Sequence, residues 1–369
     1  MPKLRVGLLF GGRSTEHEVS IASATSILGA LDPARYEVRL IAVDPEGRWH
    51  LGTPALPPGA SIDGPEVTLP AIPGIGALVS SSESAQASSS AESTPIDVLF
   101  PIIHGRGGED GALQGLMELA DVAYVGAGVL SSAVQMDKEV AKRLLRATGI
   151  AVVPWVCVRG AELSPPQLAA SATRAVSELG LPVFVKPSNS GSSVGTARAG
   201  TPPEVEAALA DAARYDTKVL VEKAVDAREI EVAVIGNADP EASVPGEIRC
   251  AQEFYDYAAK YADDQGTELL IPAPLSEEES ERIRGVAIEA YKVLDGEGLA
   301  RVDFLLDRQS GELTINELNS LPGFTEGSMF PRLWEATGLP YPALIDRLIE
   351  LALERHAQRS RLETTYRRG

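Results

Sequence analysis

Short apolar runs alternate with stretches of helical periodicity through the first third of the chain. Leu4–Phe10 and Val38–Val43 are apolar enough for buried strands, and Glu16–Leu31 between them has the pattern of a helix. A further strand is expected at Asp97–Ile103 and a helix at Ala112–Ala120. Because strands alternate with helices, the pattern predicts an open α/β layer.

A second unit is predicted to start near residue 130. Its first helix opens at Met136-Asp137-Lys138 and reaches about Ala147, where Gly149 follows as a typical helix-ending residue. After Pro154 the pattern predicts further strands, among them Pro182–Pro187 and Val219–Val225. A separate α/β unit therefore follows the first.

The last part of the chain has the pattern of an antiparallel sheet with covering helices. Arg228–Val234 alternates between acidic and apolar residues, and two apolar runs at Leu299–Leu306 and Leu313–Leu318 flank a polar turn that ends in glycine. An amphipathic helix is expected at Glu277–Leu294 and a closing helix at Tyr341–His356. We therefore expect a β-hairpin near the C-terminus.

The hairpin carries the first candidate site. Since side chains alternate along a strand, Arg301 and Asp303 share one face of the first strand, and Glu317 and Asn319 share one face of the second. Pairing the strands would gather two acids and an amide beside an arginine. Oxygen ligands without Cys or His suit a hard cation such as Mg²⁺. The alternative is a surface hairpin with solvated acids.

Residues 51–94 are rich in proline and glycine, and Ser80–Thr94 contains little besides Ser, Ala, Glu and Gln. This composition buries little apolar surface, so we expect an irregular, mobile excursion and assign it no function.

Composition excludes several classes of protein. The 369 residues suffice for two or three domains, and the net charge of −19 argues against nucleic acid or an anionic membrane as a partner. We find no apolar run of membrane-spanning length and no signal peptide at the N-terminus. The two cysteines, Cys157 and Cys250, have no metal or redox spacing. A cytoplasmic protein is therefore expected.

Two loops have the composition of anion sites. Lys186 ends an apolar strand and precedes a Ser- and Gly-rich loop at 188–195, which offers a compact positive charge and many N–H and hydroxyl donors. The lysine precedes the glycines, so the P-loop order is absent. Gly11-Gly12 before the first helix is a weaker signal, and Glu16 there has the alternative role of complementing the helix dipole. For 188–195 the alternative is a mobile surface hairpin.

Taken together, these segments resemble the D-alanine–D-alanine ligase family of the ATP-grasp fold. The matching motifs, in family order, are GGRSTEHEVS, HGRGGEDG, MDK, VKPSNSGSSVG, VEKAV, REIEVAV, EFYDYAAKY, ARVDF and NELNSLPGFTEGSM. The Ser-rich stretch at 80–94 departs from the family pattern. The resemblance implies a mixed α/β fold with an N-terminal open α/β domain at 1–130, a central ATP-grasp subdomain at 131–225 and a C-terminal ATP-grasp domain at 226–369.

The resemblance also implies a reaction and a set of site residues. ATP would phosphorylate the carboxylate of one D-alanine, and the amine of a second D-alanine would attack the acyl phosphate to give a peptidoglycan precursor. The implied catalytic residues are Glu16, Ser192, Tyr261, Arg301 and Gly323. The implied substrate-binding residues are Glu16, His104, Ser328 and Met329. The implied ATP-binding residues are Lys138, Lys186, Ser193, Glu222, Lys223, Val225, Glu229, Phe254 and Lys260. The implied ligands of two Mg²⁺ ions, or of Mn²⁺, are Asp303, Glu317 and Asn319. A homodimer is implied as well.

Alternatives remain for the substrate and for single residues. Lys260-Tyr261 resembles the dipeptide-forming branch of the family, but D-serine or D-lactate as second substrate, or another carboxylate–amine pair, stays open. A nucleotide-binding regulatory protein without turnover is disfavoured because the metal triad and Arg301 are present. Glu222 and Glu229 have the alternative of solvated strand ends. A dinucleotide oxidoreductase is weaker still, because GGRSTEHE departs from the required glycine pattern.

Overall fold

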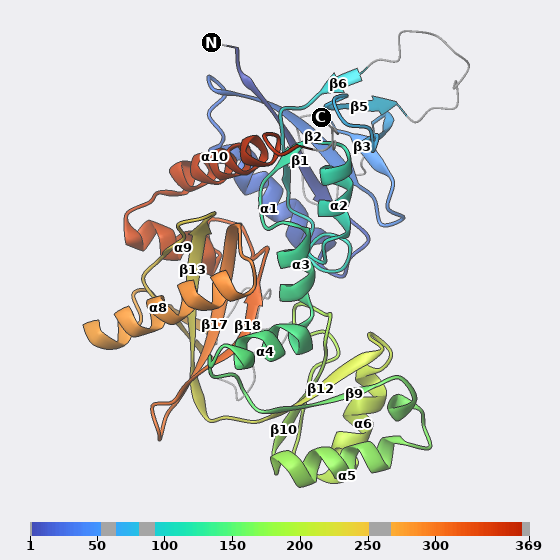
Figure 1. Cartoon of the computed structure of the whole chain (residues 1–369), viewed down its shortest axis with the longest axis vertical. Helices are drawn as coiled ribbons and strands as arrows, with labels where there is room; N and C mark the ends of the chain where they lie inside the picture. The colour runs from blue at the N-terminus through green and yellow to red at the C-terminus, as the bar shows by residue number, and fades with distance from the viewer. Residues whose placement is uncertain (1, 53–63, 81–92, 251–266, 364–369) are drawn as a thin grey trace, which may run out of the picture.

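The computed structural model describes residues 2–52, 64–80, 93–250 and 267–363, and the chain there forms three sheets with helices packed against them (Figure 1). The elements alternate along the chain much as the hydrophobic pattern predicts. None of the helices in these ranges is both long and apolar enough to cross a membrane.

The first sheet has the strand order β6-β5-β4-β3-β2-β1-β7-β8. Its parallel part, where β2, β1, β7 and β8 lie side by side, consists of β1 (Leu4–Gly11), β2 (Tyr36–Val43), β7 (Val98–Pro101) and β8 (Ala123–Tyr124). Its antiparallel extension consists of β3 (Trp49–Leu51), β4 (Glu66–Thr68), β5 (Ala77–Ser80) and β6 (Ser93–Pro95). The helices here are α1 (His17–Ala30) and α2 (Ala112–Leu119).

The prediction of an irregular excursion at 51–94 is wrong for its described parts, which form β4, β5 and the start of β6. Single apolar residues explain the difference: Val67, Leu69 and Leu78 are buried and pack in one core cluster with Leu9 and Ile41. One inward side chain per short strand is too little periodicity to recognise in sequence. The serine stretch at 81–92 lies outside the described residues.

The second sheet has the order β11-β10-β12-β9, with all its strands antiparallel. Two helices, α3 (Val129–Met136) and α4 (Lys138–Ala147), lead into it, and Asp137 caps α4 by accepting from the Val140 N–H. The strands are β9 (Trp155–Arg159), β10 (Val183–Pro187), β11 (Ala197–Ala199) and β12 (Lys218–Lys223). The short 3-10 turn η1 (Gly160–Leu163), α5 (Leu168–Leu179) and α6 (Pro202–Ala212) complete the unit.

The third sheet has the order β16-β15-β13-β17-β18, and β14 pairs with β13 at its side. Its strands are β13 (Ala227–Gly236), β14 (Glu241–Ala242), β15 (Gly246–Cys250), β16 (Thr267–Leu270), β17 (Gly298–Asp307) and β18 (Leu313–Asn319). Its helices are α8 (Glu277–Val293), α9 (Met329–Thr337) and α10 (Tyr341–Arg359). Ser276 and Glu279 form a capping box that fixes the start of α8.

A β-bulge interrupts the hairpin of β17 and β18. Asp303 faces Glu317 and Phe304 faces Ile315, so Asn316 is an extra residue on β18. Ile315 is buried in the core beneath the sheet, whereas Asn316 and Glu317 are only half-buried and both contact lysines described below. The bulge therefore lets two consecutive polar side chains each contact a lysine, Asn316 with Lys186 and Glu317 with Lys138.

The end of the chain returns to the first sheet, where α10 packs against β7, β8 and α1. One core cluster joins Leu8, Phe10 and Ile27 of the N-terminal part with Phe324 and Leu348. The contact is fixed by Arg355, which donates to the carbonyl oxygens of Tyr124 and Gly126. The first and third sheets consequently share a core.

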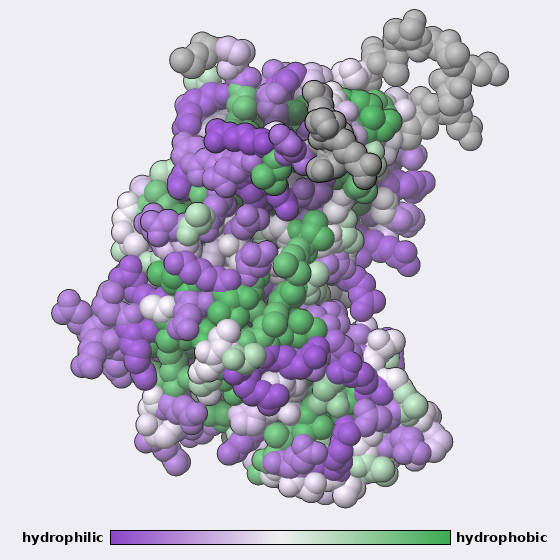
Figure 2. All heavy atoms as spheres, viewed as in Figure 1, coloured by the Kyte–Doolittle hydropathy of each residue, from purple (hydrophilic) through white to green (hydrophobic). Residues whose placement is uncertain are grey.

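Polar side chains cover most of the visible surface, and apolar ones gather in its middle over α3 and α4 (Figure 2). Leu130 of α3 is 61% exposed and Leu144 of α4 is 39% exposed. Each of the three sheets lies within one of the segments 1–130, 131–225 and 226–369, and we keep this division as a proposal.

Candidate active site

The polar face of the third sheet carries a cluster of charges. Arg301 donates from Nε to Asp303 Oδ1 at 2.7 Å and from Nη2 to Asp303 Oδ2 at 2.6 Å. The same Nε lies 3.0 Å from Oε2 of Glu231 on β13. Burial works to lower the pKa of Arg301, but the carboxylates of Asp303 and Glu231 raise it well above its ordinary value. Arg301 is therefore a permanently charged, fixed group.

Strand pairing brings the candidate metal ligands together as side-chain alternation predicts. Asp303 is opposite Glu317, and Arg301 is opposite Asn319. Two carboxylates and an amide oxygen on neighbouring strands suit Mg²⁺, which completes its shell with water and phosphate oxygens. The described part of the chain has no cluster of three or more His, Cys, Asp or Glu side chains that could hold a metal, so this mixed set is the candidate. Its role as a metal site stays a prediction.

A buried group of charges lies at the junction of the second and third sheets. Glu222 accepts from Lys186 Nζ at 2.8 Å and lies 2.9 Å from Lys142 Nζ, and all three residues are at most 7% exposed. Lys186 also donates to Asn316 Oδ1 at 3.1 Å. Burial works to raise the pKa of Glu222, but the two lysines hold it below its ordinary value. The alternative of a solvated strand end is therefore excluded for Glu222.

The pKa values of Lys142 and Lys186 shift in opposite directions beside Glu222. Burial lowers the pKa of Lys142, and Glu222 only partly offsets the effect because Lys186 is also nearby. For Lys186 burial acts in the same direction, but Glu222 and Glu317 outweigh it and the pKa is raised. Lys186 is therefore the more strongly stabilised cation of the pair.

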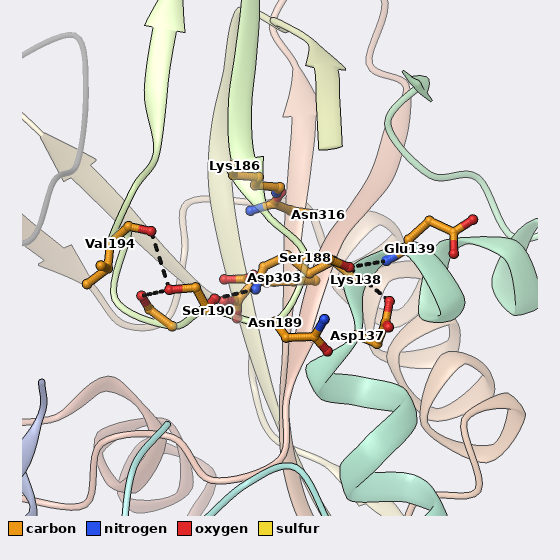
Figure 3. Close-up of polar contacts among 12 residues, drawn as sticks. Asp137, Lys138, Glu139, Lys186, Ser188, Asn189, Ser190, Val194, Asp303 and Asn316 are labelled. Atoms are coloured by element: carbon orange, nitrogen blue, oxygen red, sulfur yellow. Dashed lines mark hydrogen bonds and ion pairs between the residues drawn. The ribbon is translucent and has the colours of Figure 1, made fainter. Parts of the chain in front are cut away.

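The loop 188–195 is anchored on the start of α4 (Figure 3). Ser188 donates from Oγ to Asp137 Oδ1 at 2.8 Å and accepts at its carbonyl oxygen from the Lys138 N–H at 3.2 Å. Lys138 Nζ donates to the Ser190 carbonyl oxygen at 2.7 Å and lies 3.2 Å from Glu317 Oε2. Lys138 thus connects the loop to the hairpin. These contacts do not fit the alternative of a mobile surface hairpin, and the role of the loop in binding phosphate stays a prediction.

The tip of this loop reaches the start of α1, next to the first sheet. Ser192 donates from Oγ to Oε1 of Glu16, which precedes the first residue of α1 and is 7% exposed. The backbone approaches closely as well, because a Cβ added to Gly191 would lie 3.1 Å from Glu16 Oε2. Ser192 and Ser193 have φ of 48° and 58°, the left-handed region that non-glycine residues seldom occupy. The loop is therefore held in a closed arrangement over Glu16.

His104 is a buried residue whose ring is close enough to Glu16 to be affected by its charge. Its Nδ1 lies 3.1 Å from the Leu321 carbonyl oxygen, which can only accept, so Nδ1 carries the proton. Glu109 Oε1 is 3.8 Å away, and among the described residues Nε2 has no hydrogen-bond partner. Burial works to lower the pKa of His104, but Glu109 and Glu16 raise it. His104 thus uses Nδ1 for a structural hydrogen bond, while its buried Nε2 makes no hydrogen bond with the described residues.

The segment after the hairpin leads into the start of α9. Ser328 precedes the first residue of α9, and its Oγ accepts from the Thr325 N–H at 3.1 Å. A Cβ on Gly323 would lie 3.1 Å from this Oγ, so the backbone passes close to it. Met329 opens the helix and is buried. A helix start with free N–H groups favours a carboxylate.

The remaining predicted ATP residues lie at the exit of β12 and on β13. Lys223 and Glu229 are exposed and Val225 is half-buried, so the solvated alternative stays open for Glu229. Phe254, Lys260 and Tyr261, with the predicted flap that holds them, lie outside the described residues.

Sequence reasoning missed three residues that contact this cluster. Lys142 follows Lys138 by four positions, the spacing of neighbours on one helix face, and Glu231 alternates with Glu229 on one strand face. Both spacings can be read from the sequence. Asn316 had no such signal, because only the bulge brings it to Lys186.

Comparison with known proteins places these residues in a family context. The profile described as D-ala D-ala ligase N-terminus matches residues 5–127, and the one described as D-ala D-ala ligase C-terminus matches residues 144–350. A D-alanine–D-alanine ligase A of Chromobacterium violaceum is 50% identical over 358 residues, 96% of this chain and 96% of that protein. A D-alanine–D-alanine ligase of Thermoanaerobacter pseudethanolicus is 46% identical over 363 residues, 98% of this chain and 99% of the other.

Solved structures agree with the fold. The D-alanine–D-alanine ligase of Coxiella burnetii superposes with a TM-score of 0.81 at 38% identity, over 97% of each chain. The VanG D-Ala:D-Ser ligase of Enterococcus faecalis superposes with a TM-score of 0.82 at 30% identity, over 95% of this chain and 100% of the other. With its ATP-grasp architecture and two matching profiles that span most of its length, the chain belongs to the D-alanine–D-alanine ligase family.

Proposed function

We propose that this chain joins two D-alanine molecules at the expense of ATP, through an acyl phosphate, to supply D-alanyl-D-alanine for peptidoglycan. The observation that carries the proposal is the contact between two halves of a phosphate site. Lys138 and Lys186, beside the serine-rich loop, reach Glu317 and Asn316 of the acidic hairpin within 3.2 Å. The lysines that would bind phosphate oxygens therefore lie next to the hairpin whose acids would bind a metal ion.

The nucleotide would lie between the second and third sheets. Lys138 and Lys186 would hold its phosphates together with the N–H groups of Ser193 and its neighbours, and Lys260 would join them from the flap. Glu222, Lys223, Val225, Glu229 and Phe254 would contact the adenosine part. Because the carboxylate of Glu222 is ionised and buried, it would be a strong acceptor for a hydrogen bond that the amino group of adenine donates.

Asp303, Glu317 and Asn319 would hold two Mg²⁺ ions, or Mn²⁺. When bound, such ions neutralise phosphate charge during phosphoryl transfer. In this structure the acids already hold cations of the protein, since Asp303 contacts Arg301 and Glu317 contacts Lys138. Both carboxylates thus already lie against positive charge, which supports a cation-binding role for them.

The substrates would lie on the other side of Arg301. Glu16 would bind the ammonium group of the first D-alanine, with His104 beside it. Ser328 and the Met329 N–H would bind the carboxylate of the second. Arg301 and the Gly323 N–H would stabilise the oxyanion that forms when the amine attacks. Ser192, and Tyr261 from the flap, would close the site, because an acyl phosphate exposed to water is lost to hydrolysis.

Coupled ADP release with ATP, Mg²⁺ and D-alanine, with mass identification of the product, tests the proposal. Dipeptide and ADP in equal amounts are expected. D-Serine and D-lactate in parallel reactions decide the second substrate, and turnover only with one of them would overturn D-alanine in that position. We further propose a cytoplasmic homodimer, for which the sedimentation velocity of the purified protein is the test.

A further inference from the structure

Glu231 on β13 is a buried acid next to Arg301. It is directly opposite Asp303 in the pairing of β13 with β17, and it is 6% exposed while Asp303 is 9% exposed. Arg301, two residues before Asp303, points between the two carboxylates. Two acids from different strands therefore flank one guanidinium.

Both acids lie close to the same nitrogen of Arg301, which hydrogen-bonds to Asp303 and forms an ion pair with Glu231. Nε lies 2.7 Å from Asp303 Oδ1 and 3.0 Å from Glu231 Oε2, whereas Nη2 donates to Asp303 at 2.6 Å. A single N–H makes one strong hydrogen bond, and here Asp303 accepts it. If an Asp303 oxygen were drawn toward a metal ion, the carboxylate of Glu231, 3.0 Å from Nε, would still hold the guanidinium.

We propose that Glu231 is a positioning residue that holds Arg301 in place while Asp303 serves as a metal ligand. This inference rests on the proposed function, because it takes Asp303 as a ligand of the nucleotide's metal. Without Glu231, Arg301 would depend more on Asp303 and would compete with the metal for its carboxylate. Partners of metal ligands commonly affect metal affinity in this way.

Direct binding of Mn²⁺ in the presence of ADP, followed by electron paramagnetic resonance, tests the inference without turnover. Glu231→Gln is expected to weaken Mn²⁺ binding by about tenfold, as loss of a ligand's outer partner does elsewhere. The matched control is Glu247→Gln. Glu247 is 1% exposed on β15 of the same sheet, and it pairs with Arg228 at 2.7 Å, away from the candidate metal ligands. The control is expected to lower the melting temperature without changing Mn²⁺ affinity.

A second variant separates position from charge. Glu231→Asp keeps the negative charge but withdraws the carboxylate from Arg301 by one methylene. The inference predicts weaker Mn²⁺ binding for this variant too. Wild-type affinity in Glu231→Asp would mean that charge alone matters, and wild-type affinity in Glu231→Gln would mean a purely structural role. Either result overturns the inference.

The proposed function is tested independently by dipeptide formation in the wild-type protein. If wild type binds Mn²⁺ and ADP but makes no dipeptide, the proposed reaction fails while the Glu231 comparison still stands. If wild type makes dipeptide and both Glu231 variants bind Mn²⁺ normally, the reaction stands and the role of Glu231 fails.

Discussion

Replacing Glu222 by glutamine is expected to destabilise the protein far more than replacing Lys142 by methionine. Glu222 is the shared counter-ion of two buried ammonium groups, at 2.8 and 2.9 Å. Replacing it by a neutral glutamine leaves the buried ammonium groups of Lys142 and Lys186 without this negative charge. Removing one partner of a buried ion pair costs about 3–5 kcal/mol of folding free energy. Lys142→Met instead leaves a one-to-one pair and an apolar chain of similar length, so we expect a loss below about 1.5 kcal/mol.

Thermal unfolding of the two variants measures this difference. Domains of about 150–250 residues lose about 2–4 °C of melting temperature per kcal/mol, and on that scale we expect a drop of roughly 10 °C for Glu222→Gln and only a few degrees for Lys142→Met. The lowered pKa of Lys142 and the raised pKa of Lys186 support the same order, because they make Lys142 the less stabilised cation. Equal drops in the two variants, or an unchanged melting temperature in Glu222→Gln, would refute the reasoning.

Three further changes probe the loop, the first sheet and the core. Ser192→Ala removes the hydroxyl that holds the loop to Glu16, so ADP released per dipeptide is expected to rise above one in the coupled assay. Burial works to raise the pKa of Asp44, but hydrogen bonds from Arg48 and His50 lower it to about 2. Its stabilising contribution is therefore complete above about pH 4 and lost as the pH falls toward about 2, a slope that Asp44→Asn should flatten in melting curves. Phe324→Ala removes a fully buried ring and should cost about 3–5 kcal/mol in chemical denaturation, whereas a loss below about 1 kcal/mol would contradict its place in the core.

Strand alternation was enough to place Arg301, Asp303, Glu317 and Asn319 on neighbouring strands, because burial of one face fixes the register. Alternation fails at Asn316, since a bulge depends on how the partner strand pairs and leaves no local pattern.

Helix α6 was missed although Thr201 before Pro202 is a recognisable helix start, with Thr201 accepting from the Glu204 N–H. The sharing of Glu222 by two lysines was beyond prediction for another reason. It depends on how α4 packs against the second sheet, which side-chain periodicity does not specify.

The position of α10 has a consequence for how the protein is made. Leu8, Phe10 and Ile27 emerge early from the ribosome, but their packing partners Leu348 and Leu351 are synthesised more than three hundred residues later. During translation the nascent N-terminal segment must therefore keep an incomplete apolar face until the last helix arrives. Truncations that remove only α10 should consequently yield aggregating chains, even though the candidate catalytic residues would all still be present.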